Sequence, residues 1–424
     1  MYIAAHYALK LEIILSTNYT SSWKILLQNS NLRKMFFAYF ISFTGSSMAP
    51  IAMAFGILEL TGSTKDTAFV IATPTFASIL VLVLGGVLAD RSSRQKIIVG
   101  AESTAMLVQL VIATLFLTGN ASISAMIVLM LINGITIAFN APAATGFITQ
   151  LVDKKDLQAT NALLGIARNL ALIMGAALGG LLVAFIGAGW TILIDAISFG
   201  LSALFVYSII PNKQVKHHPE SIVKELVLGW KEFTHHKWIW VIVLQFAFVV
   251  AGIDAFMGLL GPSVAKDYLN GPSDWGLIAG AVGLGTLIGG LIAFKLTVKY
   301  PMRLATICVL FFSLIPLAMA ISLPFYLIML SAVLAGLGIQ IFSVIWFTTL
   351  QIKIPAEMLS RVCAYDHIGS ISLAPLGIVV SGFLYEYFGY QIVLILAALI
   401  IIVPTLLVLL VKDVWKMRAN HSSL

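Results

Sequence analysis

The chain has 424 residues, of which 60% are hydrophobic and only 10% charged, and its formal net charge is +7 at pH 7. Soluble domains carry about 25% charged residues, so this composition excludes a water-facing globular domain. The bilayer core offers the backbone no hydrogen-bond partners, so apolar runs of about 20 residues that cross it must be helices. The composition therefore predicts a polytopic membrane protein.

Apolar runs separated by short polar breaks follow one another along the whole chain. Residues 1–34 precede the first run, and we expect them to form a cytoplasmic N-terminal lead-in. Twelve transmembrane helices are expected, at 35–59, 67–89, 97–118, 121–144, 159–185, 189–210, 239–262, 275–297, 302–320, 324–350, 361–388 and 391–411. The sequence thus predicts an all-α membrane protein.

Lysine and arginine are distributed unevenly between the two sets of breaks. The N-terminal lead-in, the even-numbered breaks and the C-terminal tail (412–424) hold 22 of the 25 basic residues when the three at the edges of those breaks (Lys295, Arg303 and Arg361) are included. The odd-numbered breaks hold Lys65 and Lys266, and Arg168 lies within a span. Because cytoplasmic loops carry the excess of Lys and Arg, we expect a multi-pass protein of the cell (inner) membrane with both termini cytoplasmic. Cytoplasmic loops that face the lipid bilayer account for the excess of basic over acidic residues, and no nucleic acid partner is expected.

The longest polar interval, 211–238, divides the chain into two six-helix bundles, 35–210 and 239–411. In its stretch ESIVKELVLGWKEF the apolar residues fall on one helical face and the charged residues on the other. This pattern predicts an amphipathic helix on the inner leaflet, with a plain tether as the alternative. The two halves also resemble each other, for example GGVLADR (85–91) and GGLIAFK (289–295). Parallel repeats of six helices are a transporter architecture.

The stretch GGVLADRSSR resembles the loop between the second and third helices of the major facilitator superfamily, whose pattern is G-x-x-x-D-R-x-G-R-R/K. Gly86, Asp90, Arg91 and Arg94 match this pattern. The strings LELTGST, NAPAA, DLQATNALL and GWKEFTHHKWI are similar to the drug-exporter branch that contains macrolide-efflux proteins and the enterobactin exporter. The resemblance covers almost the whole chain.

The resemblance implies the major facilitator fold and secondary active transport by alternating access. It implies proton-coupled efflux of a small amphipathic molecule, such as an antibiotic, a siderophore or another secondary metabolite. A lipid or lysolipid transporter of the same fold is the alternative, and a non-transporting receptor or scaffold is the remote one. Two positions depart from the antiporter pattern: Met130 replaces the arginine often found four residues before Gly134, and Ala176 replaces a proline in GAALGG.

The matched loop residues are expected to form a conformational latch. Gly86 allows close helix approach, Asp90 can face the positive end of a helix, and Arg91 and Arg94 can form multidentate contacts with acids. Such a latch is made in one access state and broken in the other. The alternative is a topology signal with no further role.

Ionisable side chains inside apolar runs are costly and usually functional. Asp254 lies about fifteen residues, hence about 22 Å, along the seventh span, and the resemblance implies that this helix lines the central cavity. Asp254, Glu102 and Asp366 are the proton-coupling candidates, with a structural role for Asp254 as the alternative. Arg168 is expected to form an intramembrane ion pair with Glu102 or Asp366. Asp195 is interpreted as a helix-start feature.

The resemblance also implies that the first, fourth and tenth spans line the central cavity with the seventh. Polar and aromatic residues on these spans are candidates for contact with a small-molecule substrate: Asn133, Asn140, Gln245, Gln340 and Trp346. No G-x-x-x-x-G-K-[ST], D-D-x-x-D or H-E-x-x-H motif occurs, so we do not expect an enzyme or an ATP-driven pump. Cys308 and Cys363 lie within or at the edge of apolar runs, which argues against a disulfide. No cofactor or metal is expected, and the protein is expected to act as a monomer.

Overall fold

The computed structural model describes residues 26–91, 93–153, 156–211, 222–296 and 298–418. All regular elements in these ranges are helices, which confirms the predicted all-α membrane fold. The N-terminal bundle consists of α2 (Ser30–Thr61), α3 (Thr64–Arg91), α4 (Arg94–Leu117), α5 (Ile123–Leu151) and α6 (Leu157–Tyr207).

The C-terminal bundle is built from shorter pieces. After α7 (Ile222–His235) it contains α8 (Lys237–Ala255), the π-helix η2 (Phe256–Leu260), α9 (Gly261–Tyr268), α10 (Pro272–Lys295), α11 (Pro301–Val309), the 3₁₀-helix η3 (Leu310–Ser313), α12 (Leu314–Ala320), α13 (Phe325–Lys353), α14 (Ala356–Ile371), α15 (Ala374–Leu409) and α16 (Lys412–Trp415). The largest fully buried side chains lie inside the two bundles and include Phe55, Phe147, Phe256 and Trp275.

The longest helix of each bundle folds back on itself at a glycine. Gly187 in α6 has φ 82° and Gly389 in α15 has φ 76°. Glycine adopts positive φ without the steric penalty that a side chain imposes. The two glycines end the strings FIG and YFG, so the sequence similarity of the halves coincides with a shared structural turn.

Local sequence explains where several helices begin and end. The Asn29 side chain accepts a hydrogen bond from the Leu32 N–H at 3.1 Å and caps α2, which therefore begins before the predicted start at residue 35. Ser122 caps α5 in the same way, and Gly62, with φ 65°, ends α2 in the left-handed conformation. These are the residue types that helix termini favour.

Nine helical stretches among the described residues are long and apolar enough to cross a membrane. Two of them, Ala159–Tyr207 and Arg361–Leu409, contain the glycine turns, and α3 is a further helix of 28 residues. The expectation of a multi-pass membrane protein is therefore confirmed, while the count of twelve spans stays a prediction.

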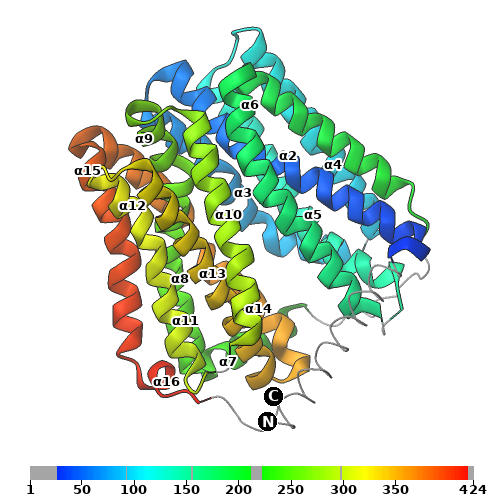
Figure 1. The fold of residues 1–424 in the computed structure, drawn as a ribbon. Coiled ribbons are helices and arrows are strands. Elements are labelled where there is room, and N and C mark those ends of the chain that lie inside the picture. Colours follow the sequence, from blue (N-terminus) through cyan, green and yellow to red (C-terminus); the bar gives the residue numbers. More distant parts are fainter. Residues whose placement is uncertain (1–25, 92, 154–155, 212–221, 297, 419–424) are drawn as a thin grey trace, which may run out of the picture.

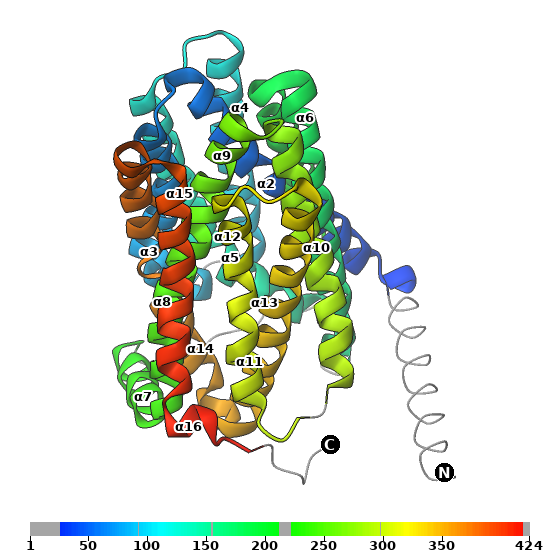
Figure 2. The ribbon, with the colours of Figure 1, turned by 60° about the vertical axis from the view of Figure 1, so that its left-hand side comes forward.

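The two bundles lie side by side, meet at one end and diverge toward the other (Figures 1 and 2). The end where they meet, called here the closed end, carries the turns at Gly62, Gly187 and Gly389. The opposite end, called here the open end, carries the start of α2 and the short helix α16.

At the closed end, α6 and α10 are in contact through glycines. A Cβ atom added to Gly180 would stand 2.5 Å from the Cα of Gly276 and even closer to the carbonyl oxygen of Pro272. Real Cβ atoms do not approach backbone atoms so closely. The absence of side chains at these two positions therefore lets the two bundles touch, backbone to backbone.

A charged contact joins α3 and α15 at the same end. The Lys65 Nζ lies 2.7 Å from the Glu386 Oε2, and the Ser63 hydroxyl donates to the Glu386 Oε1 at 3.0 Å. The same ammonium lies 5.4 Å from the centroid of the Phe383 ring and 5.0 Å from that of Tyr387. Because the partners come from different bundles, this cluster holds the bundles together at the closed end.

Candidate functional site

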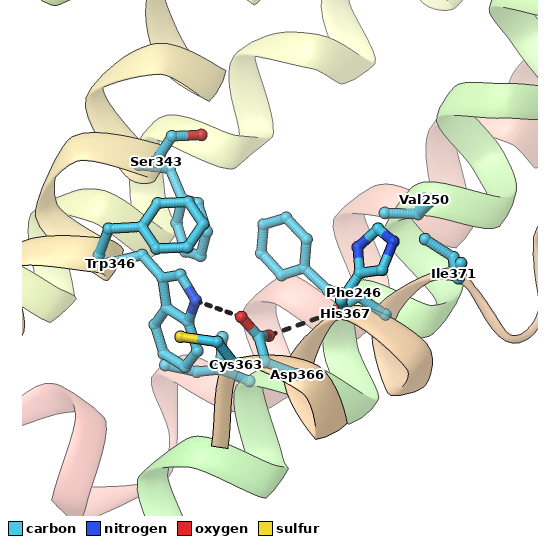
Figure 3. A pocket seen from close by; sticks show the side chains of 12 residues that line it. Phe246, Val250, Ser343, Trp346, Cys363, Asp366, His367 and Ile371 are labelled. Carbon is cyan, nitrogen blue, oxygen red and sulfur yellow. Dashed lines mark hydrogen bonds between the residues drawn. The ribbon is translucent and has the colours of Figure 1, made fainter. Parts of the chain in front are cut away.

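A cavity of about 280 Å³ lies in the C-terminal bundle, between α8, α13 and α14 (Figure 3). Its walls are mainly aliphatic and aromatic, with a small number of polar groups, the composition usual for small-molecule sites. The lining residues are Ile242, Phe246, Val250, Phe342, Ser343, Trp346, Phe347, Cys363, Asp366, His367, Ser370 and Ile371.

Asp366 and Trp346 point toward each other in this cavity (Figure 3). The indole Nε1–H of Trp346 donates to the Asp366 Oδ2 at 2.9 Å, and the Ser370 hydroxyl donates to the Oδ1 at 3.4 Å. The imidazole of His367 is exposed beside them. A carboxylate held in a fixed orientation within an apolar wall is a recognition element for a cation or for hydrogen-bond donors.

Aromatic rings surround this carboxylate. Phe246 stacks on Phe342 with ring centroids 4.3 Å apart, and Phe342 stacks on Trp346 at 6.0 Å. Trp238 meets Trp346 edge-on at 5.4 Å. Aromatic faces attract both flat rings and cations, so the cavity suits an aromatic molecule that carries a basic or donor group.

Asp254 lies on α8, one turn beyond Val250, which lines the cavity. Residues four apart share a face of a helix, so Asp254 continues the cavity-lining face of α8 toward the closed end. Within the described residues its half-buried carboxylate has no hydrogen-bond or ion-pair partner. The π-helix η2 begins two residues later, at Phe256, and such irregularities are frequent at functional sites.

Glu102 is buried in the N-terminal bundle, away from the cavity. Its Oε1 accepts from the Asn140 amide at 2.8 Å and its Oε2 from the Ser42 hydroxyl at 3.2 Å. Asn140, predicted as a cargo contact, is thus engaged with a buried acid in this conformation. The interaction joins α4 to α5.

Asp195 lies in the second arm of α6 and is completely buried. Its Oδ2 accepts from the Gln109 side chain at 2.8 Å, and the Ser198 hydroxyl lies 3.3 Å from its Oδ1. The interpretation as a helix-start feature is therefore wrong, because the residue belongs to a polar network inside the bundle. The sequence contains a signal for this network, because Gln109 and Asp195 are both polar residues within apolar runs.

The expected ion pair of Arg168 is not formed in the described part of the chain in this conformation. The guanidinium lies over the ring of Phe43, 5.2 Å from its centroid, and the side chain is exposed. Glu102 is engaged with Asn140 and Ser42 instead, and Asp366 belongs to the other bundle. A cation–π contact therefore takes the place of the predicted pair.

Three other predicted cargo contacts lie outside the cavity. Gln245 is buried and donates to the Thr405 hydroxyl at 2.9 Å, so it faces α15. Gln340 packs on Gly289 of α10, and Asn133 is half-buried on α5. Of the predicted contact residues, Trp346 lines the cavity.

The predicted latch is only partly covered by the structure. α3 ends at Arg91, and the side chains of Asp90 and Arg91 and the surroundings of Gly86 lie outside what the structure describes. Arg94 begins α4, and its Nη1 donates to the Gly146 carbonyl at 2.7 Å. Arg94 thus contacts α5 of its own bundle.

Known structures share this architecture. The nucleoside transporter NupG superposes with a TM-score of 0.73 at 14% identity, over 92% of this chain and 100% of that chain. A bacterial homologue of the human lysosomal transporter Spinster, in an inward-facing and unoccupied conformation, gives a TM-score of 0.73 at 14% identity, over 92% and 98% of the two chains. These similarities confirm the predicted major facilitator fold.

Sequence relatives agree with this assignment. The chain is 25% identical to the enterobactin exporter EntS of Shigella boydii serotype 18 over 351 residues, which cover 80% of this chain and 81% of that protein. It is 24% identical to the enterobactin exporter of Escherichia coli O81 over the same shares. The model of the transmembrane secretion effector family matches residues 20–423. The protein is therefore a membrane transporter, not an enzyme, and belongs to the transmembrane secretion effector family of the major facilitator superfamily.

Proposed function

We propose that this transporter exports a small amphipathic molecule, coupled to protons, and that the cargo binds in the cavity around Asp366. The observation that carries the proposal is an aromatic cavity with a fixed carboxylate, within bundles that meet at one end and diverge at the other. Substrate accumulation in cells with and without the protein tests it. The relatives are enterobactin exporters, which supports the proposed direction of transport.

The distribution of basic residues supports a cytoplasmic position for the open end. Arg94, Arg303 and Lys412 lie at that end, whereas Lys65 and Lys266 lie at the closed end. By the positive-inside rule the conformation is then open to the cytoplasm and closed to the outside. In such a state an exporter receives its cargo.

Cysteine labelling of intact cells tests this orientation. In a background with Cys308 and Cys363 replaced by serine, we expect a membrane-impermeant maleimide to label Asn270→Cys in intact cells. We expect Ser93→Cys to react only after the cells are permeabilised, because it lies at the open end. Labelling of Ser93→Cys in intact cells, with Asn270→Cys protected, would reverse the topology.

The cavity indicates the chemical class of the cargo. Its stacked rings of Phe246, Phe342 and Trp346 favour a flat aromatic group, and Asp366 favours a basic centre or phenolic and amide donors. The cargo class is therefore an aromatic molecule with polar donors. A lysolipid, whose acyl chain lacks donors, fits these contacts less well.

Coupling to protons is proposed to involve Asp254, with Glu102 and Asp366 as further carriers. Asp254 continues the cavity-lining face of α8 and has no partner within the described residues, so a proton can be gained or lost there without breaking a contact. Gly86, Asp90, Arg91 and Arg94 are proposed to form the latch that holds the open end together when the bundles close there.

Replacing Asp254 by asparagine is expected to separate coupling from cargo movement. The change keeps the size of the side chain and fixes it in a neutral form, so uphill export driven by a pH gradient should fall at least tenfold. Exchange of cargo down its own gradient should stay within twofold of wild type. Proteoliposomes with and without an imposed pH gradient measure both quantities.

The matched control is Asp413→Asn, which removes an exposed carboxylate at the open end of the same bundle and should leave both activities unchanged. Loss of both activities in Asp254→Asn would indicate a binding or structural role. Retained pH-driven export would exclude Asp254 from coupling.

A further inference from the structure

A second, larger groove lies on the C-terminal bundle and is lined by the end of α15 and by α16. Figure 2 shows α16 following the lower end of α15. The volume of the groove is about 710 Å³. Its apolar wall belongs to the last two turns of α15, and α16 supplies a lysine and a tryptophan. The residues that line it are Val403, Leu406, Leu407, Leu409, Leu410, Lys412 and Trp415.

The wall of this groove faces away from the protein. Leu407 is 59% exposed and Leu410 is 78% exposed. α15 belongs to a stretch apolar enough to span a membrane, and that stretch ends at Leu409. The groove therefore lies at the depth where hydrocarbon gives way to lipid headgroups, and acyl chains are the apolar groups that surround a membrane span there.

The headgroup side of the groove is basic. Lys412 lies at its rim, and Lys416 and Arg418 are exposed a few residues further along the chain. Residues 412–418 thus contain three basic residues and one acid, Asp413. The Trp415 indole stacks on the guanidinium of Arg303, with the Arg303 Cζ 3.6 Å from the ring centroid.

Tryptophan and basic residues are enriched where a span meets the headgroups. The Arg303–Trp415 contact fixes α16 against α11, so the rim is held in position relative to the apolar wall.

From these observations we propose that the groove binds one phospholipid with an anionic headgroup. An acyl chain lies along Leu406, Leu407 and Leu410, and the phosphate meets the Lys412 ammonium. The bound lipid holds the C-terminal end of α15 at the membrane surface. This site faces the bilayer and is separate from the cargo cavity between α8, α13 and α14.

Native mass spectrometry of the purified full-length protein tests the proposal. Protein released from nanodiscs of phosphatidylglycerol and phosphatidylethanolamine, matched in acyl chains, should retain one phosphatidylglycerol in preference. A basic residue near an anionic surface contributes about 1 kcal/mol, so Lys412→Gln should lower that retention about fivefold. Leu407→Glu, which places a charge in the exposed apolar wall, should lower it at least as much.

Lys353→Gln is the matched control, because it removes an exposed lysine at the open end of the same bundle and should not change retention. Equal retention by wild type and both groove variants would overturn the proposal. So would a loss seen in Lys412→Gln but absent in Leu407→Glu, since a phosphate bound by charge alone needs no apolar wall. Equal preference for the two lipids would overturn the anionic assignment.

Discussion

Replacing Gly180 by valine is expected to lower transport at least tenfold while the protein still inserts and folds. The new side chain would meet the backbone of Pro272 and Gly276 across the contact between the bundles, and backbone atoms cannot rotate away as a flexible side chain can. Inserting atoms into a packed contact costs about 1–3 kcal/mol. Because about 1.4 kcal/mol changes an equilibrium tenfold, the state in which the two bundles meet at the closed end becomes rare.

The matched control is Gly165→Val on the same helix, because a Cβ at Gly165 meets nothing within 4 Å. Both variants place a β-branched residue in α6, so they share the change in helix propensity and differ in the inter-bundle clash. Transport of a labelled substrate in proteoliposomes measures the effect. Equal activity of Gly180→Val and Gly165→Val would show that the contact between α6 and α10 is not needed for the cycle.

Replacing Asp366 by asparagine is expected to lower the apparent affinity for a basic or donor-rich substrate about tenfold or more. Hydrogen bonds to charged groups contribute about 1.5–3 kcal/mol, and the substitution removes the charge from the cavity. The asparagine side-chain oxygen can still accept from the Trp346 indole, so the cavity should keep its shape. Competition transport assays with Asp366→Asn measure the change.

A neutral analogue of the same substrate provides the control for Asp366→Asn. Its apparent affinity should change less than twofold, because it lacks the group that the carboxylate recognises. A variant that transports the basic and the neutral compound as wild type does would remove Asp366 from cargo recognition. A variant that loses both equally would indicate a collapsed cavity.

Much of the fold could be predicted from the sequence because apolar runs, helix-capping residues and glycines at turns determine it locally. Asn29 and Ser122 explain helix starts, and the FIG and YFG strings contain the glycines at which α6 and α15 turn back. Helix ends were less predictable. α5 continues to Leu151, beyond the predicted end at 144, because a helix can extend past the hydrocarbon core.

The site was less predictable because it depends on how the helices are rotated about their axes. The sequence indicates different roles for Trp346 and Asp366, and only the packing of α13 on α14 brings the Trp346 Nε1 and the Asp366 Oδ2 within 2.9 Å. Gln245 was expected to face the cavity, but α8 turns it toward Thr405 of α15.

Arg168 was expected to require an acid, and the ring of Phe43 accommodates its charge instead. The spacing of residues in one sequence does not show how a helix is rotated about its axis. In a helix that is apolar on all sides, any face could be the one that lines the cavity. The residues at helix ends were therefore easier to place than those that line the cavity.

The most direct test of the proposed function is accumulation in cells that express the wild-type protein or Gly180→Val at equal levels. A panel of labelled aromatic antibiotics, catechol-type siderophores and lysolipids should be measured with and without a protonophore. We expect wild-type cells to accumulate less of at least one aromatic, donor-bearing compound than Gly180→Val cells, and the protonophore to abolish the difference. Equal accumulation of every compound in the two strains, or a difference confined to lysolipids, would contradict the proposal.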